Sequence, residues 1–437
     1  MKIVDRIIRT SARSQATLPL KDYLGKKLRE TYYNAEVLYR IQDKTEPLTL
    51  RIRGDAPRRV NLLLPEVNFD SLYGGYMAKF NLARKLIDTG CRVRIVVVDP
   101  SVYDPARLHA AVRNYAGLED IFEILEVAYQ GDRKETLDVS NGDRFIATTW
   151  WTAYLAHHAT ARCNGPPFVY LIQEYEPFTF PMGSYYAMAH NSYSFPHVAL
   201  FSSDLLREHF ELNRIGVYDG RHDRKQGEVA GYFENAIVSF EPSELDEALS
   251  GGREEGGGRR RLLFYARPEA HATRNMFEVA FLALARAIET GVFDDSWEFH
   301  GIGSRHGDIG LPGGRKLRML GKFGLAEYRR ALLNYDVGLS LMYTPHPSLL
   351  PLDMASAGLI VVTNTCLNKS AERLRQLSQN LIGAKPHVDG VRQGLEQACQ
   401  LSGDLRHRRD GTRVKWAGSW DQSFNEPLMN RLKSWLE

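Results

Sequence analysis

The stretch LMYTPHPSLLPLDMASAGLIVVTN, residues 341–364, decides the expected fold of this chain. It begins at the end of an apolar run (residues 337–342), continues through a Pro-rich loop into a short helix, and ends in a second apolar run (residues 359–363). Polar ligands bind beyond the carboxyl ends of such parallel strands, where backbone amides and a helix N-terminus can contact them. With the Asp353 carboxylate in the first helical turn, the stretch predicts either a ligand site or an ordinary strand–helix–strand crossover.

Apolar strand segments alternate with helical segments on both sides of a Gly-rich stretch. The first series has strands at residues 60–65, 92–99, 144–148, 168–172 and 197–201. The second series has strands at residues 261–266, 297–301, 335–342, 359–363 and 380–384. Strands that are separated by helices form mainly parallel, doubly wound sheets. We therefore expect an α/β chain with two Rossmann-like, doubly wound domains that face each other across an interdomain cleft.

The domain boundaries follow from length and composition. A chain of 437 residues is too long for one compact core, so two domains are expected. The Gly-rich and charged stretch before residue 261 lacks hydrophobic periodicity, as a flexible linker does. The expected division is an N-terminal extension (1–59), a first Rossmann-like domain (60–245), a linker (246–260), a second Rossmann-like domain (261–411) and a C-terminal helix (412–437).

Composition excludes several classes of protein. The net charge of +3 is too small to argue for a nucleic-acid partner. The four cysteines lie far apart, so they indicate neither a zinc site nor a disulfide framework, and we expect a cytoplasmic protein. No apolar run is long enough to span a bilayer. Residues 1–14 form a basic amphipathic pattern, which predicts a helix that docks on its own domain or makes peripheral contact with an anionic membrane.

Two arginines mark the start of the second domain. Arg267 directly follows the strand at residues 261–266, and Arg274 comes seven residues later, before a helix. A diphosphate needs fixed cations or a metal to neutralise its charge, and Arg offers a bidentate donor geometry. The pair therefore predicts a diphosphate site, and the alternative is two solvated surface arginines.

Strand ends of the first domain carry a second group of candidates. The pair Gly74 and Gly75 lies between the first strand and its helix, where backbone amides can approach a phosphate or a sugar. Glu174 and Glu176 follow the strand at residues 168–172, with aromatic residues behind them. Carboxylates and aromatic rings together suit sugar hydroxyls, although an aromatic loop between domains is the alternative.

Motifs of other enzyme classes are not found in the sequence. The chain contains no GxGxxG, no phosphate loop, no HExxH and no convincing Ser–His–Asp arrangement. It also lacks the paired aspartates (DxD) that hold a divalent metal against a diphosphate. We therefore expect no metal and no cofactor.

Five motifs, taken in order, are similar to those of GT-B glycosyltransferases. They are NFDSLYGGYMAKFNLARKL (68–86), ATTWWTAYLA (147–156), IQEYEPFTFPMGSYY (172–186), FYARPEAHATRNMFEVA (264–280) and PHPSLLPLDMASAGLIVVTN (345–364). More narrowly, the chain from about residue 60 onward resembles the WsaF-like rhamnosyltransferase group within glycosyltransferase family 4. That resemblance implies a GT-B fold, in which the first domain binds the acceptor and the second binds a nucleotide sugar.

The resemblance also implies roles for single residues. Arg267 and Arg274 match the basic pair that holds the donor diphosphate, although Thr273 stands where the family often has Lys. Asp353 matches the second acidic residue of the family motif Glu-x7-Glu, which binds the nucleotide ribose. Pro345, followed by His346, stands at the first acidic position, which contacts the donor sugar in related enzymes. That departure disfavours a glucose- or mannose-type donor and favours a 6-deoxy sugar such as rhamnose, carried on dTDP.

Further site residues are carried over in the same way. Donor-binding positions beside Asp353 are His346, Ser348, Leu349, Gly74 and Gly75. The catalytic group comprises Arg267 and Arg274, with Glu174 and Asp70, or Glu176, as the candidate protein base. Alternatively, the departing phosphate oxygen takes the acceptor proton.

The resemblance implies transfer of a sugar, with retention of configuration, to a hydroxyl of a growing glycan. The expected partners are a nucleotide-sugar donor, a saccharide or lipid-linked acceptor and an optional membrane surface, without nucleic acid. Two alternatives stay open: a transferase that uses a UDP- or GDP-sugar, and a non-catalytic nucleotide-sugar binding protein. The half-present acidic motif supports the second alternative.

Overall fold

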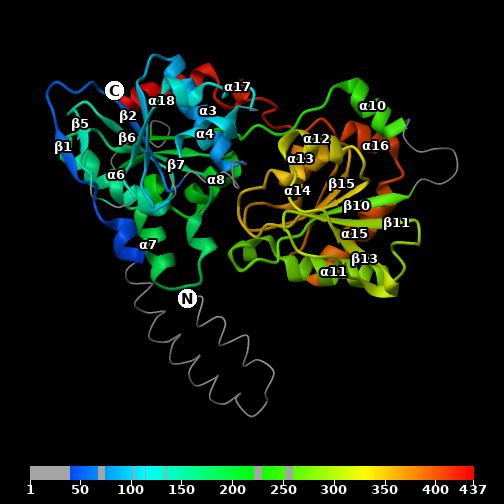
Figure 1. Ribbon diagram of the computed structural model, residues 1–437. Helices are drawn as coiled ribbons and strands as arrows, with labels where there is room; N and C mark the ends of the chain where they lie inside the picture. Colours follow the sequence, from blue (N-terminus) through cyan, green and yellow to red (C-terminus); the bar gives the residue numbers. More distant parts are fainter. Residues whose placement is uncertain are drawn as a thin grey trace, which may run out of the picture.

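Two α/β domains lie side by side in the computed structural model (Figure 1). The structure describes residues 40–66, 74–101, 104–113, 115–131, 133, 135–220, 229–250 and 259–437. The predicted basic helix at residues 1–14 and the candidate base Asp70 lie outside the described residues.

The first domain contains a seven-stranded, wholly parallel sheet with the order β4-β3-β2-β6-β7-β8-β9. Its strands are β2 (Val60–Leu64), β3 (Val93–Val97), β4 (Glu126–Tyr129), β6 (Arg144–Ala147), β7 (Phe168–Ile172), β8 (His197–Phe201) and β9 (Ala230–Tyr232). Every residue of β2, β3, β7 and β8 is buried. Sequences of continuous apolar residues are typical of parallel strands that helices cover on both faces, and they made these strands predictable.

Helices and 3-10 turns connect these strands. They are α3 (Gly75–Asp88), α4 (Pro105–Val112), α5 (Ile121–Ile124), α6 (Trp150–Arg162), η3 (Glu176–Thr179), α7 (Ser184–Ser192), α8 (Asp204–Leu212) and η4 (Gly216–Tyr218). The start of α8 is defined by Ser203, whose hydroxyl accepts a hydrogen bond of 3.1 Å from the backbone N–H of Leu206. Such an N-cap satisfies one of the free donors at the start of a helix.

The second domain has another seven-stranded sheet, with the order β12-β13-β11-β10-β14-β15-β16. Its strands are β10 (Arg260–Tyr265), β11 (Trp297–Ile302), β12 (Ile309–Gly310), β13 (Lys316–Met319), β14 (Val337–Leu339), β15 (Ile360–Asn364) and β16 (Leu381–Ala384). All pairs are parallel except β12 with β13. The connecting elements are η5 (Ala270–Asn275), α11 (Phe277–Glu289), η6 (Pro312–Gly314), α12 (Leu325–Leu332), α13 (Leu350–Ser356), α14 (Ala371–Leu377), α15 (Val388–Leu401) and α16 (Leu405–Asp410).

Helices cover both faces of this second sheet. On β10, Leu262 and Phe264 belong to a core with α11 and α15, whereas Leu263 belongs to a separate core with α13 and α14. Successive side chains of a strand point to opposite faces, so the two cores lie on opposite sides of the sheet. The expected doubly wound architecture is confirmed for this domain.

The predicted linker at residues 246–260 is wrong in its first part. Helix α10 (Pro242–Ser250) extends into it, and Leu245 of this helix is buried. Glu244 forms an ion pair of 2.6 Å with Arg329 of α12, so α10 packs on the second domain. Because an ion pair helps to hold α10 in place, the helix needs few buried apolar residues. Its sequence therefore shows only a weak hydrophobic pattern.

The predicted N-terminal extension also contains a missed strand. β1 (Leu50–Ile52) pairs in parallel with β5 (Leu137–Val139) in a small second sheet of the first domain. Its residues are half-buried or exposed, so no buried apolar run marked it in the sequence.

The end of the chain returns to the first domain (Figure 1). Helices α17 (Trp420–Ser423) and α18 (Glu426–Leu436) follow the second domain. Leu432 and Leu436 of α18 are buried in the core of the first domain, beside strands β2 and β7. The chain therefore crosses between the domains twice.

The strand orders identify where ligands can bind. In each sheet the order reverses once, between β2 and β6 in the first and between β10 and β14 in the second. Ligands of open parallel sheets bind outside the carboxyl ends of the strands at such a reversal. The segments after β2, β10 and β14 carry most of the predicted site residues, and Glu174 and Glu176 follow β7, next to β6.

Candidate active site

Arg267 is held at the carboxyl end of β10. Its Nε donates to the Glu269 carboxylate at 3.0 Å, and its Nη1 donates to the Tyr265 hydroxyl at 3.1 Å. Gly303, which follows β11 with φ +99°, allows this side chain to pass, because a Cβ there would lie 2.9 Å from Arg267 Cδ. Those contacts fix the guanidinium beside the point where the strand order reverses.

Arg274 lies in η5, next to the loop that follows β14. Its carbonyl oxygen accepts a hydrogen bond of 2.8 Å from the backbone N–H of Tyr343. Met276, two residues on, has a positive φ of 48°, which ends the 3-10 turn and starts α11. The buried Nε of Arg274 has no hydrogen-bond partner among the described residues. An unpaired buried donor of this kind suits an anionic ligand.

The loop between β14 and α13 contains the predicted donor-binding residues. His346 is buried, and its Nδ1 accepts a hydrogen bond of 3.0 Å from the backbone N–H of Ser348, whose φ is +66°. Burial lowers the pKa of His346 to about 3, and the nearby Lys369 acts in the same direction, so the imidazole is neutral. Leu349 Cδ1 lies 3.7 Å from where a Cβ on Gly74 would be, so this loop approaches the glycine pair of the first domain.

Asp353 makes its hydrogen bonds within the protein. One carboxylate oxygen accepts a hydrogen bond of 2.8 Å from the backbone N–H of Val238, and the other accepts one of 3.3 Å from the Tyr328 hydroxyl. Burial raises the pKa of Asp353 to about 7, although both hydrogen bonds act in the opposite direction. The structure thus places the predicted ribose-binding carboxylate against the segment that joins the two domains.

Glu174 meets the second domain at the carboxyl end of β7. Its carboxylate interacts with the charges of Arg274 and Lys369 and with the Thr344 hydroxyl. Burial raises the pKa of Glu174, and those two cations and the hydroxyl offset part of the rise. The structure therefore brings together Glu174 and Arg274, which were predicted from motifs in different domains. One carboxylate oxygen, Oε2, is buried and has no hydrogen-bond partner among the described residues.

Lys369 is a site residue that the sequence analysis missed. It is fully buried, and its Nζ donates to the carbonyl oxygens of Met342 at 2.7 Å and His346 at 3.4 Å. Burial lowers the pKa of Lys369 to about 8, against the opposing effects of Cys366 and Glu174. The position of a lysine shortly after a buried strand, β15, was the available signal.

Glu176 performs a local structural task in the first domain. Its carboxylate accepts a hydrogen bond of 2.6 Å from the backbone N–H of Trp150, the first residue of α6. Burial raises the pKa of Glu176 to about 7, while this hydrogen bond and the Lys79 ammonium act in the opposite direction. Lys79 is also buried, and burial lowers its pKa to about 8. Glu176 lies two residues after Glu174 in the same segment, so the charge of this buried acid acts on that of the candidate base.

Gly75 packs against the same loop. A Cβ on Gly75 would lie 2.8 Å from Gln173 Oε1, and the side-chain amide of Gln173 donates to the Gly75 carbonyl oxygen at 3.2 Å. The two strand-end loops therefore meet at Gly75, where an added Cβ would displace the end of the Gln173 side chain.

Comparison with known families covers both domains. The N-terminal domain model of WsaF matches residues 59–204, and the C-terminal domain model of WsaF matches residues 260–396. The chain belongs to the WsaF family. The GT-B resemblance of the five motifs is thereby confirmed. This WsaF family member is also 31% identical, over 276 residues, to the O-antigen biosynthesis protein RfbC of Myxococcus xanthus. The match covers 61% of this chain and 19% of RfbC, so the chain spans about a fifth of that curated relative.

Solved structures confirm the GT-B fold of this WsaF family member. Anabaena HepE in complex with UDP and glucose is 12% identical, with a TM-score of 0.55 over 86% of this chain and 98% of HepE. The pneumococcal O-GlcNAc transferase GtfA in complex with UDP and GlcNAc is 10% identical, with a TM-score of 0.56 over 87% of this chain and 98% of GtfA. Sucrose-phosphate synthase from Thermosynechococcus elongatus is 9% identical, with a TM-score of 0.55 over 86% of this chain and 98% of the synthase.

Two further features concern the described residues as a whole. Within them, no helix combines the length and apolar character that a membrane crossing requires. No three His, Cys, Asp or Glu side chains are grouped there in a way that would hold a metal ion.

Proposed function

We propose that this WsaF family member transfers a sugar from a nucleoside-diphosphate sugar to a hydroxyl of a growing glycan. The observation that carries the proposal is the meeting of Glu174, from the first domain, with Arg274 and Lys369 from the second. That meeting lies at the carboxyl ends of the strands in both sheets, where GT-B enzymes bring donor and acceptor together.

Arg267 and Arg274 are proposed to stabilise the negative charge of the leaving group. As the sugar leaves, negative charge builds up on the diphosphate, and fixed cations that stabilise it supply the largest part of catalysis. Arg267 is already oriented by Glu269 and Tyr265, and Arg274 has a buried donor available. Those two guanidinium groups neutralise the leaving diphosphate, so the proposed reaction needs no metal.

The donor is proposed to be dTDP-rhamnose. Pro345 stands where related enzymes have a glutamate, and the next residue, His346, is buried and neutral, so these two positions offer no carboxylate to sugar hydroxyls. A 6-deoxy sugar has one hydroxyl fewer to satisfy and presents a methyl group instead. Asp353 is proposed to accept the deoxyribose hydroxyl with the lone pairs that Val238 and Tyr328 leave free. A UDP-sugar is the second candidate, because HepE and GtfA were solved with UDP.

The proton of the acceptor hydroxyl has two proposed destinations. In the first, the departing phosphate oxygen accepts it, which retains the anomeric configuration without a covalent enzyme intermediate. In the second, Glu174 accepts it, since burial raises its pKa and Oε2 has no hydrogen-bond partner within the described part of the chain. A base works best when its pKa approaches the working pH.

The acceptor is proposed to be a saccharide, free or lipid-linked, in cell-surface polysaccharide synthesis. The name of the relative RfbC, an O-antigen biosynthesis protein, supports this assignment. The reaction is proposed to take place in the cytoplasm, with peripheral contact at the membrane when the acceptor is lipid-linked.

A nucleotide-release assay tests the proposed function. The purified chain is incubated with dTDP-rhamnose, UDP-glucose and GDP-mannose in turn, and the released nucleoside diphosphate is measured. Release from dTDP-rhamnose above that of the Arg267→Ala variant is expected. Binding of a nucleotide without release from any donor would overturn the proposal and support a non-catalytic binding protein.

A further inference from the structure

Lys369 is buried between two parts of the site. Its ammonium group has three N–H donors, and two of them bond to the carbonyl oxygens of Met342 and His346. These two carbonyls lie at the two ends of the turn that carries Thr344, between β14 and α13. A buried cation is costly unless charged or polar groups surround it, so its presence here needs an explanation.

The turn has few other hydrogen bonds of its own. The Thr344 hydroxyl donates to the His346 carbonyl at 3.3 Å, and the Met342 N–H donates to Asn364 Oδ1 at 2.7 Å. Without the ammonium, the Met342 carbonyl would keep only its 3.0 Å hydrogen bond from the Thr344 N–H, and the His346 carbonyl only the one from the Thr344 hydroxyl. Hydrogen bonds to a charged group contribute more than neutral ones, so the turn would be expected to move when the two bonds from the ammonium are lost.

Lys369 also faces the first domain. The charge of Glu174, at the end of β7, acts on Lys369, and Thr344 of the same turn interacts with Glu174. Its neighbour Asn368 donates to the Leu205 carbonyl at 2.8 Å and to the Glu208 carboxylate at 2.9 Å, both on α8. Lys369 therefore sits where the β15–α14 loop of the second domain touches the first.

We propose that Lys369 is a positioning residue whose ammonium group shapes the turn at residues 342–346 for the donor and joins that turn to Glu174 of the acceptor domain. The proposal deepens the proposed function and rests on it, because it assigns to this turn the recognition of a nucleotide-sugar donor. Lys369 itself acts through Met342 and His346.

The test compares Lys369→Met with Lys369→Arg. Methionine keeps most of the side-chain volume but removes the positive charge and the N–H donors. Arginine keeps the positive charge and the N–H donors. The dissociation constants of dTDP, UDP and GDP are measured by calorimetry well below the melting temperature. We expect Lys369→Met to weaken the best nucleotide roughly 10- to 100-fold, the range for a lost charge-assisted hydrogen bond, and Lys369→Arg to restore part of the affinity.

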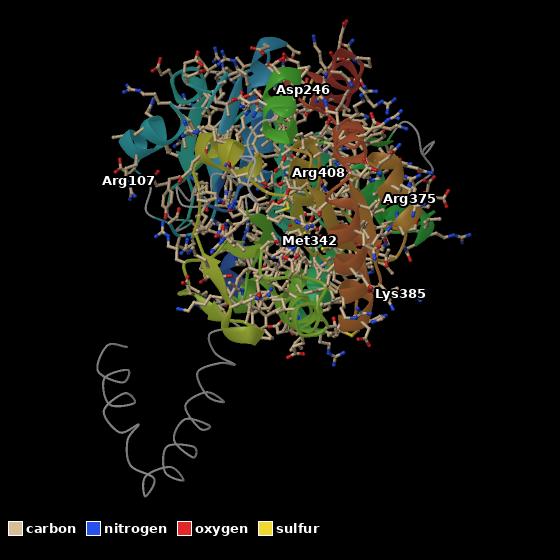
Figure 2. All side chains as sticks on the ribbon, turned by 90° about the vertical axis from the view of Figure 1, so that its right-hand side faces the viewer. Arg107, Asp246, Met342, Arg375, Lys385 and Arg408 are labelled. Atoms are coloured by element: carbon tan, nitrogen blue, oxygen red, sulfur yellow. The ribbon has the colours of Figure 1, made fainter. Side chains whose placement is uncertain are left out.

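Lys385 provides a matched control. It follows β16 as Lys369 follows β15, in the same sheet, but it is exposed. Figure 2 shows Lys385 at the edge of the second domain, whereas Met342 lies towards the middle. Lys385→Met should leave the nucleotide affinity unchanged. A Lys369→Met variant with a lower melting temperature but unchanged affinity would overturn the positioning role.

The link to Glu174 is tested by a double-mutant cycle with Glu174→Gln. We expect the effects of Glu174→Gln and Lys369→Met on donor KM to be non-additive, since each variant removes one charge of the same electrostatic interaction. Additive effects would overturn the link. Nucleotide binding without turnover in the wild-type chain would overturn the proposed function, while the affinity comparison at Lys369 would still decide its positioning role.

Discussion

The carboxylate of Asp353 accepts a hydrogen bond of 2.8 Å from the backbone N–H of Val238, which joins the donor-side helix α13 to the segment between the two domains. Ser356, one turn later in α13, donates from its hydroxyl to the Val238 carbonyl at 2.8 Å. Both backbone polar groups of one residue of the connection, Val238, therefore form hydrogen bonds with helix α13. A movement of that helix on donor binding would be transmitted to the connection.

Replacement of Asp353 by Asn should change how stability depends on pH. Burial raises the pKa of Asp353 to about 7 from 3.8, so the folded chain holds this proton where the unfolded chain has lost it. Its contribution to stability is therefore complete below the unfolded pKa and is lost as pH rises through about 7. Urea unfolding at pH 5 and pH 8 should show that wild type loses up to about 2.6 kcal/mol more than Asp353→Asn, because pH 5 already lies above the unfolded pKa. Parallel pH profiles would contradict the raised pKa.

Removal of the Arg267 guanidinium should remove most turnover. With the diphosphate charge no longer neutralised at this position, we expect kcat to fall by roughly two to three orders of magnitude, or about 3–4 kcal/mol of barrier. Arg286→Ala is a suitable control, because Arg286 lies on α11, is exposed and pairs with Asp389. Steady-state kinetics of both variants are the measurement. Near-normal turnover by Arg267→Ala would refute the assigned role.

Truncation of Glu176 should destabilise the start of α6. Its carboxylate accepts the 2.6 Å hydrogen bond from the Trp150 N–H, so Glu176→Ala removes the acceptor of this N–H, although the capping box of Thr149 and Thr152 remains. The expected loss is about 0.5–2 kcal/mol. Glu176→Gln keeps an acceptor oxygen and should lose less. Chemical denaturation gives the free energy of unfolding of the two variants. A capping role requires Glu176→Ala to be less stable than Glu176→Gln, and equal stabilities would contradict it.

The polar contact between α8 and α14 should matter more for kinetics than for stability. Glu208 accepts a hydrogen bond of 2.9 Å from Asn368 and lies 3.6 Å from Arg373 of α14. Because these groups are partly exposed, Glu208→Ala should change the free energy of unfolding by less than about 1 kcal/mol. If the contact helps to hold the domains together around the donor, the donor KM should rise several-fold. An unchanged donor KM would show that the contact does not contribute to donor binding.

Most strands could be predicted because the pattern that marks each strand lies in consecutive residues. Runs of apolar residues such as residues 60–64 and 168–172 are buried on both faces, so each strand is visible without knowledge of its partners. β4 and β1 escaped prediction because their residues are only partly buried and show no such run. Helix α10 was mistaken for linker because it is held by Arg329 rather than by a wide apolar face.

The candidate site could be predicted one loop at a time. Arg267, Arg274 and Glu174 each follow a strand, and the carboxyl ends of parallel strands share one edge of a sheet. Lys369 also follows a strand, β15, but this signal is weak, since a lysine in a loop is solvated in most proteins. Only its burial beside Met342 and His346 identifies it.

By itself, the sequence determined two doubly wound domains, their family and the residues at several strand ends, because apolar runs and motifs are written in consecutive positions. The tertiary structure decided which of these residues meet. It brought Glu174 against Arg274 and Lys369, and it turned Asp353 towards Val238. The physical reason is that charge interactions and burial depend on distances in space. Residues of different domains come close to one another only when the chain has folded.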